Sequence, residues 1–346
     1  MTSPHTDTYL LQTILKRVSR SFYLTLAVLP HAVRAQVGLA YLFARAADTI
    51  ADTGGLDHNT RLRCLRQFKE QFQRGRIEKT EVQTIQSMAV AFQRNPSERL
   101  LLEELFRCFT FFETLSRDDQ QRIASLLPTI IEGMEFDLVQ FPQQADGHVT
   151  SLPTMKELDY YTYAVAGCVG EFWTKMMCGH LPRLSHWDTS VMVPTGIRYG
   201  KGLQLVNILK DVAQDLRLGR CYIPQSLLDE VHLQPEDLLD QRNVQRVRPI
   251  LRQLIVRALD HLDQGWSYTM AIPRLEVRLR LACMWPLLIG LRTLQQLSTS
   301  PHILDPAMSV KVSRGEVYRI MAMTTLSGGC DSVGTAYWGY LRKRVV

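Results

Sequence analysis

Hydrophobic residues recur every three or four positions along most of this chain, and runs of alternating polar and apolar residues are scarce. Such spacing predicts amphipathic or buried helices, and no strand is needed to account for it. A nearly continuous apolar run that begins at Gln36 predicts a helix buried on most sides, which ends at Gly54 and Gly55. Further helices are predicted over residues 8–18, 56–75, 78–93, 97–115, 117–140, 154–180, 188–217, 243–270, 274–297 and 313–326.

The connections between these helices are short and evenly polar, so no linker marks a domain boundary. The sequence therefore predicts an all-α fold with one helical domain over residues 1–346. Residues 219–224 are expected to form a loop, and the tail from about residue 327 is expected to be irregular.

Composition and charge exclude several classes of protein. Hydrophobic residues make up 46% of the chain and charged residues 21%, which is typical of a globular protein with a large core. Seven cysteines are scattered without a CxxC pair, which indicates reduced intracellular thiols. The net charge of +6 is dispersed and lacks the aromatic interleaving of nucleic-acid binders, so no nucleic-acid partner is expected.

The two ends of the chain bear on its location. The N-terminus lacks the apolar core of a signal peptide, and no apolar run approaches the roughly 20 residues that a spanning helix needs. We therefore expect a cytoplasmic protein without a transmembrane anchor. A peripheral contact with a membrane stays open, and oligomeric state leaves no clear trace in the sequence.

Two pairs of aspartates carry the candidate chemistry. Asp48 and Asp52 follow the apolar stretch AYLFARAA, and Asp211 and Asp215 follow GLQLVNIL. At spacing i, i+4, both side chains of a pair leave one face of a helix, one turn apart. A buried carboxylate is costly unless something positive lies against it. The pair formed by Glu236 and Asp240 has the same spacing in a polar stretch, where solvation suffices.

Ligands of this kind suit a hard divalent cation. Carboxylate oxygens on rigid helices favour Mg²⁺, which usually completes its shell with water and the phosphates of a substrate. Two such pairs facing each other would form a cage for Mg²⁺ ions and a phosphate-bearing substrate. The basic residues Arg45, Lys210, Arg217 and Arg220 lie near the pairs in sequence. They either bind a diphosphate or pair with the aspartates themselves.

Four sequence blocks together resemble the squalene and phytoene synthase family. They are SRSF at 19–22, YLFARAADTIAD at 41–52, YTYAVAGCVG at 161–170 and GLQLVNILKDVAQDLRLGRCYIP at 202–224. The resemblance runs from about residue 10 to about residue 325, with the blocks in the family's order. Two departures concern the substrate subtype: Thr162 stands where a small residue or Cys is more frequent, and Lys210 stands where Arg is common.

The resemblance implies an isoprenoid synthase, which is an all-helical bundle with a central active-site cavity. Such an enzyme joins two prenyl diphosphates head to head through a cyclopropyl intermediate, with two or three Mg²⁺ ions. It implies Asp48, Asp52, Asp211 and Asp215 as metal ligands. It implies Tyr41 and Tyr161, near the reacting carbons, and Arg45, near the diphosphates, as catalytic residues. It further implies a substrate-binding set consisting of Ser19, Arg20, Phe22, Arg45, Gln204, Asn207, Lys210, Arg217 and Arg220.

The segment SVKVSRGEVYRIM at 309–321 bears on the product. It is similar to a segment of squalene synthases near the NADPH site, which implies Lys311 and Arg314 as NADPH-binding residues. The resemblance therefore favours a squalene synthase of the soluble bacterial type, which condenses two farnesyl diphosphates through presqualene diphosphate and reduces the product with NADPH. The alternatives are a phytoene or dehydrosqualene synthase, which performs no reduction, and a non-catalytic scaffold of the same fold.

Overall fold

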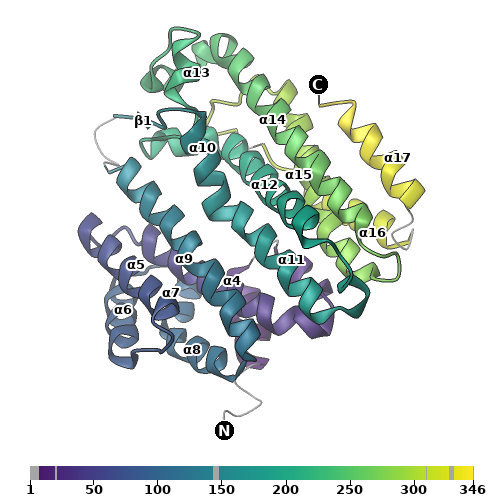
Figure 1. Ribbon diagram of the computed structural model, residues 1–346. Helices are drawn as coiled ribbons and strands as arrows, with labels where there is room; N and C mark the ends of the chain where they lie inside the picture. The colour runs from purple at the N-terminus through teal and green to yellow at the C-terminus, as the bar shows by residue number, and fades with distance from the viewer. Residues whose placement is uncertain (1–7, 20–21, 143–147, 309, 327–330, 346) are drawn as a thin grey trace. The chain divides into compact units, whose positions relative to one another are not determined.

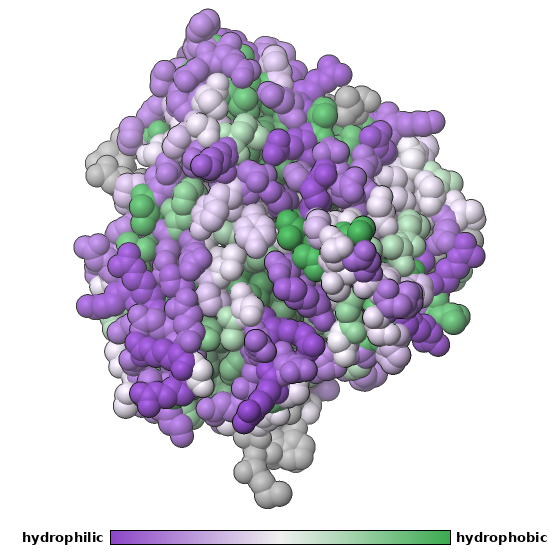
Figure 2. All heavy atoms as spheres, in the orientation of Figure 1, coloured by the Kyte–Doolittle hydropathy of each residue, from purple (hydrophilic) through white to green (hydrophobic). Residues whose placement is uncertain are grey.

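The computed structural model describes residues 8–19, 22–142, 148–308, 310–326 and 331–345. Helices account for nearly all the regular structure in these ranges (Figure 1), so the prediction of an all-α protein is confirmed. In the one face drawn in Figure 2, hydrophilic residues cover most of the surface, with hydrophobic residues scattered between them. Within the described ranges no helix combines the length and apolarity needed to cross a membrane.

The chain divides into two compact units. The first comprises Met1–Val139 and Phe172–His186, and the second comprises Gln140–Glu171 and Trp187–Val346. The single domain proposed over the whole chain stays a prediction.

The first unit is built mainly from the N-terminal helices. Phe43 of α4 packs at ring-centroid distances of 4.8 Å from Phe109 and 5.0 Å from Phe72, so one face of α4 is fixed in an aromatic core. The elements that begin in this unit are η1 (Tyr9–Ile14), α2 (Leu15–Val18), α3 (Phe22–Val28), α4 (His31–Asp52), α5 (His58–Gln73), α6 (Lys79–Phe92), α7 (Pro96–Glu103), α8 (Leu105–Thr114), α9 (Arg117–Gln140) and η3 (Pro182–Leu184).

The second unit is organised around three long helices, with α12 packed on α14 and α14 packed on α15. Its elements are β1 (Thr150–Ser151), α10 (Met155–Thr162), the π-helix η2 (Tyr163–Gly167), α12 (Thr189–Arg217), β2 (Arg220–Cys221), α13 (Gln225–Asp229), η4 (Pro235–Leu239), η5 (Gln241–Asn243), α14 (Val244–Ala271), α15 (Val277–Thr299), α16 (Arg314–Leu326) and α17 (Asp331–Arg342). Helix α11 (Cys168–His180) begins in this unit and continues into the first.

A short parallel strand pair departs from the all-helical expectation. Thr150 of β1 lies opposite Arg220 of β2, so the segment expected to be a loop over 219–224 contains the two-residue strand β2. Three predicted helices are also subdivided. The one over 8–18 consists of the π-helix η1 and of α2. The one over 97–115 consists of α7 and α8, and the one over 154–180 contains the π-helix η2 between α10 and α11.

The expectation of an irregular tail is wrong, because residues 331–342 form helix α17. Its inner face repeats Gly334, Trp338 and Leu341 at helical spacing, and the Trp338 ring stacks on that of Trp266 at 4.8 Å between centroids. Asp331 at the start of the helix pairs with Arg280, which is 1% exposed. The glycines before this segment suggested a turn, whereas the residues after them have a core to pack on.

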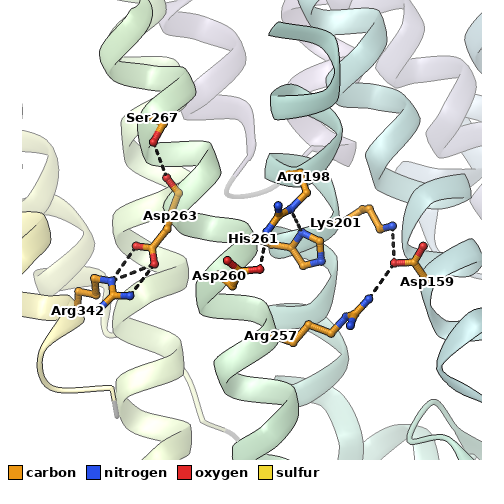
Figure 3. Close-up of polar contacts among 9 residues, drawn as sticks. All are labelled: Asp159, Arg198, Lys201, Arg257, Asp260, His261, Asp263, Ser267 and Arg342. Carbon is orange, nitrogen blue, oxygen red and sulfur yellow. Dashed lines mark hydrogen bonds and ion pairs between the residues drawn. The ribbon is translucent and has the colours of Figure 1, made fainter. Parts of the chain in front are cut away.

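A polar cluster joins α10, α12 and α14 on the second unit (Figure 3). The ammonium group of Lys201 donates to Asp159 at 2.5 Å, and Arg257 donates to the same carboxylate at 3.2 Å. The Nε–H of Arg198 donates to Nδ1 of the buried His261 at 2.8 Å. Because that ring nitrogen must accept, His261 is neutral in this arrangement. Its burial, followed by the cations Arg198, Lys201 and Arg257, lowers its pKa to about 4.

We predict that His261 makes stability depend on pH between its ordinary pKa of about 6.5 and its folded value of about 4. In that window the unfolded chain binds a proton that the folded protein excludes, so stability falls as pH falls from 6.5 towards 4. His261→Gln keeps an acceptor for Arg198 without a titrating group. Unfolding free energies measured across this range should show the wild type losing stability relative to the variant as pH falls. A difference that does not change with pH would contradict the prediction.

Candidate active site

Four of the predicted site residues form one stripe along α4. Tyr41, Arg45, Asp48 and Asp52 stand at successive offsets of four, three and four residues, so their side chains leave one face of the helix. Phe43, which packs in the aromatic core, points to the other side. The stripe is only partly covered, since the side chain of Asp48 is 40% exposed. The two aspartates are thus accessible at the edge of a buried helix rather than enclosed by it.

Arg45 bridges two carboxylates. Its Nη1 contacts Asp48 one turn along α4, and its Nη2 contacts Glu98 of α7. The side chain of Glu98 is 15% exposed, which makes it the more buried of the two partners. Of the two interpretations drawn from the sequence, pairing with an aspartate therefore describes Arg45 as the structure has it.

Asp48 lies in a field of negative charge. Although 40% of its side chain is exposed, the protein packed around the rest of Asp48 raises its pKa to about 6, and repulsion from Asp52 adds to the shift. Arg45 opposes the rise, while Glu98 and Asp137 add smaller repulsions. Glu98 and Asp137 were not among the residues predicted from sequence, because neither has a partner at helical spacing. The arrangement favours a bound cation near Asp48, since a positive charge would relieve several repulsions together.

A second stripe with nearly the same spacing follows α12. Gln204, Asn207, Asp211 and Asp215 stand at offsets of three, four and four residues, again on one face. The remainder of this part of the helix is buried through Leu205, Leu209, Val212 and Leu216 among others. The sequence places carboxylates one turn apart at the end of each stripe.

The cation beside the second stripe is a lysine. Nζ of Lys210 lies 2.7 Å and 2.6 Å from the two carboxylate oxygens of Asp211. Arg217, at the end of α12, is exposed and makes no ion pair with any carboxylate in the described part of the chain. Arg220 is half-buried in β2. Each aspartate pair therefore has a basic side chain on its first member, Arg45 in one stripe and Lys210 in the other.

Tyr161 belongs to a pair of buried tyrosines in the second unit. Its ring stacks on that of Tyr222 at 4.9 Å between centroids, and the two hydroxyl groups lie 3.3 Å apart. Phe141 packs edge-on against Tyr222 at 5.2 Å. Tyr222 was missed as a site residue, although it is the aromatic residue of the block that ends in RCYIP.

The π-helix that follows Tyr161 is held by very close backbone packing against α12. A Cβ atom added to Gly170 would lie 1.9 Å from the carbonyl oxygen of Gly196, and one added to Gly200 would lie 2.2 Å from that of Ala166. Such distances leave room only for glycine. The glycines of YTYAVAGCVG and of α12 therefore hold η2 and the start of α11 against α12, directly after the end of α10 that carries Tyr161.

The remaining predicted residues are less informative. The hydroxyl of Ser19 is buried and donates to the carbonyl of Leu15 at 2.5 Å. Arg20 lies outside the described residues, as does the side chain of Phe22. Lys311 and Arg314 are exposed. Arg314 is the first residue of α16 and Lys311 precedes it, and neither pairs with a carboxylate among the described residues.

The oxygen donors of the two stripes suit Mg²⁺. Within the described ranges, no three histidine, cysteine or acidic side chains converge on one point. Each stripe instead offers two carboxylates one turn apart, with oxygen ligands only and excess negative charge at Asp48. This suits an ion that takes few protein ligands and fills its shell with water and phosphate oxygens.

Comparison with known proteins identifies related chains. Residues 15–316 match the family Squalene/phytoene synthase. The squalene synthase of Cyberlindnera jadinii is 24% identical over 95% of this chain and 69% of its own length. A bifunctional lycopene cyclase/phytoene synthase of Pyrenophora tritici-repentis is 28% identical over 77% of this chain, which spans only 42% of that protein. A structure of TcSQS with the ligand E5700 superposes with a TM-score of 0.76 at 21% identity, covering 97% of this chain and 91% of that one, and shares the fold.

We predict that Gly200→Ala destabilises the second unit by at least about 2 kcal/mol, because the new methyl group meets backbone that cannot move aside. Gly339→Ala in α17 is the matched control, since nothing lies within 4 Å of its Cβ position. That substitution should be neutral or stabilising by about 0.5 kcal/mol through the better helix propensity of alanine. Equilibrium unfolding in urea measures both. Equal stability of the two variants would show that the contact with Ala166 is not tight.

Proposed function

Because the chain belongs to the squalene/phytoene synthase family, we propose that it joins two farnesyl diphosphates head to head. Its two carboxylate stripes would promote the loss of diphosphate from these substrates. Members of this family are prenyltransferases, and the chain is one of them. The observation that carries the proposal is the recurrence of one pattern on α4 and α12. In both helices two accessible carboxylates, one turn apart, follow an apolar stretch and have a cation on their first member.

We assign Mg²⁺ to Asp48 and Asp52, and to Asp211 and Asp215. When bound there, Mg²⁺ would supply the positive charge that stabilises a departing diphosphate. Arg45 and Lys210 already sit beside these carboxylates, and their remaining N–H groups can donate to diphosphate oxygens. Gln204 and Asn207 offer amide donors from the same face of α12. These neutral and cationic donors would bind the diphosphate end of a substrate. The prenyl hydrocarbon chain of the substrate would then lie against apolar side chains.

Tyr161 and Tyr222 are proposed to act on the carbon skeleton. Their stacked rings offer an aromatic face, and an aromatic face stabilises positive charge that develops near it. The contact between the two hydroxyls allows one oxygen to accept while the other donates, so a proton can be held at either oxygen. Burial keeps water away from this pair, which matters because water would quench a carbocation.

For the product, we propose squalene, formed through presqualene diphosphate and reduced with NADPH. Support comes from Lys311 and Arg314, two exposed cations without described carboxylate partners, placed at the N-terminal end of α16 where a phosphate is favoured. A phytoene or dehydrosqualene synthase would need no such site. A non-catalytic scaffold would have no reason to keep both aspartate pairs.

We predict that Asp48→Asn or Asp211→Asn abolishes release of diphosphate from farnesyl diphosphate, lowering turnover by about 10³-fold or more, since each change removes a charged metal ligand. Asp118→Asn, at an exposed position in the first turn of α9, is the control and should retain wild-type turnover. Diphosphate release and circular dichroism are measured together. Near-normal turnover in either stripe variant would refute the metal assignment.

The product prediction is tested by incubating the purified chain with farnesyl diphosphate and Mg²⁺, with and without NADPH. We expect squalene only when NADPH is present. Lys311→Gln combined with Arg314→Gln should raise the NADPH concentration needed for half-maximal reduction by about thirtyfold, because each of the two lost phosphate contacts costs roughly 1 kcal/mol. Dehydrosqualene formed regardless of NADPH, or turnover with geranylgeranyl diphosphate alone, would overturn the product. Failure to release diphosphate from any prenyl diphosphate would overturn the function.

A further inference from the structure

Glu98 sits at a helix start where its side chain has a more usual task. It is the third residue of α7, after Asn95 at the N-cap and Pro96 at the first helical position. An acidic side chain at this position commonly turns back to the backbone N–H of the N-cap residue. In this chain the carboxylate of Glu98 instead contacts Arg45.

Other side chains already satisfy the backbone N–H groups at the start of α7, so the Glu98 carboxylate is not needed as a cap. The side-chain oxygen of Asn95 accepts from the backbone N–H groups of Ser97 and Glu98, at 3.0 Å and 3.4 Å. The N–H of Asn95 donates to the side chain of Gln93 at 2.8 Å. Both halves of the cap are therefore satisfied without the Glu98 carboxylate, which is left to serve another element.

Arg45 divides its guanidinium between two unlike partners. Nη2 is held by Glu98 on a different helix, whose side chain is 15% exposed, and Nη1 is held by Asp48, whose side chain is 40% exposed. Removing one partner from a partly buried charge is costly, so an arginine with a single partner keeps it tightly. With two partners, Arg45 can leave Asp48 and still have its charge balanced by Glu98.

We propose that Glu98 is a positioning residue that anchors Arg45, so that a divalent cation can take Asp48 while the freed Nη1 of Arg45 donates to a diphosphate. The inference rests on the proposed function of the α4 stripe and adds a residue to it. It identifies Glu98 as acting through Arg45 rather than on the substrate itself. An anion held this way binds more weakly when Glu98 is neutralised, although a negative charge has been removed nearby.

The direction of the change in anion affinity distinguishes anchoring by Glu98 from a simple charge effect. Plain electrostatics predicts that loss of a neighbouring negative charge tightens binding of an anion. Anchoring through Arg45 predicts that it weakens binding. Calorimetric titration of the full chain with inorganic pyrophosphate, at a saturating Mg²⁺ concentration established for each variant, separates the two without measuring turnover.

We expect Glu98→Gln to weaken pyrophosphate binding by about tenfold, the size of one charge-assisted hydrogen bond. In a background of Arg45→Met, the further change Glu98→Gln should alter affinity by less than about twofold, because Glu98 would have nothing left to anchor. Glu98→Asp keeps the charge and should bind better than Glu98→Gln. Thermal melting of each variant checks that it is folded.

Glu103→Gln is the matched control on the same helix. Glu103 is 43% exposed and pairs with Arg99 one turn away, so its neutralisation should leave pyrophosphate affinity within about twofold. Unchanged or tighter binding in Glu98→Gln, or an equal loss in both Arg45 backgrounds, would overturn the role of Glu98 while leaving the proposed function intact. A wild-type chain that binds no pyrophosphate with Mg²⁺ would overturn the proposed function and this inference together.

Discussion

Asp48 and Asp52 repel each other across one helical turn, and the packing behind α4 keeps them there. Phe43 and its aromatic neighbours fix one face of the helix, so the carboxylates cannot relieve their repulsion by rotating the helix away. In the proposed function, a cation bound at these carboxylates would relieve that repulsion. The core of the first unit would then support the proposed cation site by holding α4 rigid, without touching the ion.

The second unit meets the same requirement by other means. Its stripe lies on α12, which packs along α14 on one side and against the π-helix η2 through glycine contacts on another. These contacts leave little freedom for either helix to slide. The stripe on α12 and the tyrosine pair of Tyr161 and Tyr222 therefore share one rigid support, which suits a reaction in which charge must develop at a fixed place.

Much of this could be predicted from the residues alone. Helical periodicity gave the all-α fold, and spacing of four residues placed each aspartate pair on one face. The sequence could not show that Arg45 is shared with Glu98, because that contact spans residues far apart in the chain. The sequence also did not predict α17, because a segment that follows Gly328 and Gly329 looks irregular. The residues that α17 packs on or pairs with, Trp266 and Arg280, lie more than 50 residues earlier in the chain. Tyr222 lies in a recognised sequence block, but its stacking on Tyr161, which is 61 residues away in the chain, could not be seen from that block alone.

Helix α17 also completes the core of the second unit, although it lies outside the residues that the family model matches. The family match ends at residue 316, yet the charge of the buried Arg280 is met by Asp331, and the indole of Trp266 is covered by Trp338. A fragment trimmed to the matching residues would lose both the counter-ion of Arg280 and the ring that covers Trp266. The residues that the family model matches therefore do not include every contact that completes the core of the second unit, although the squalene synthase of Cyberlindnera jadinii is similar over 95% of this chain.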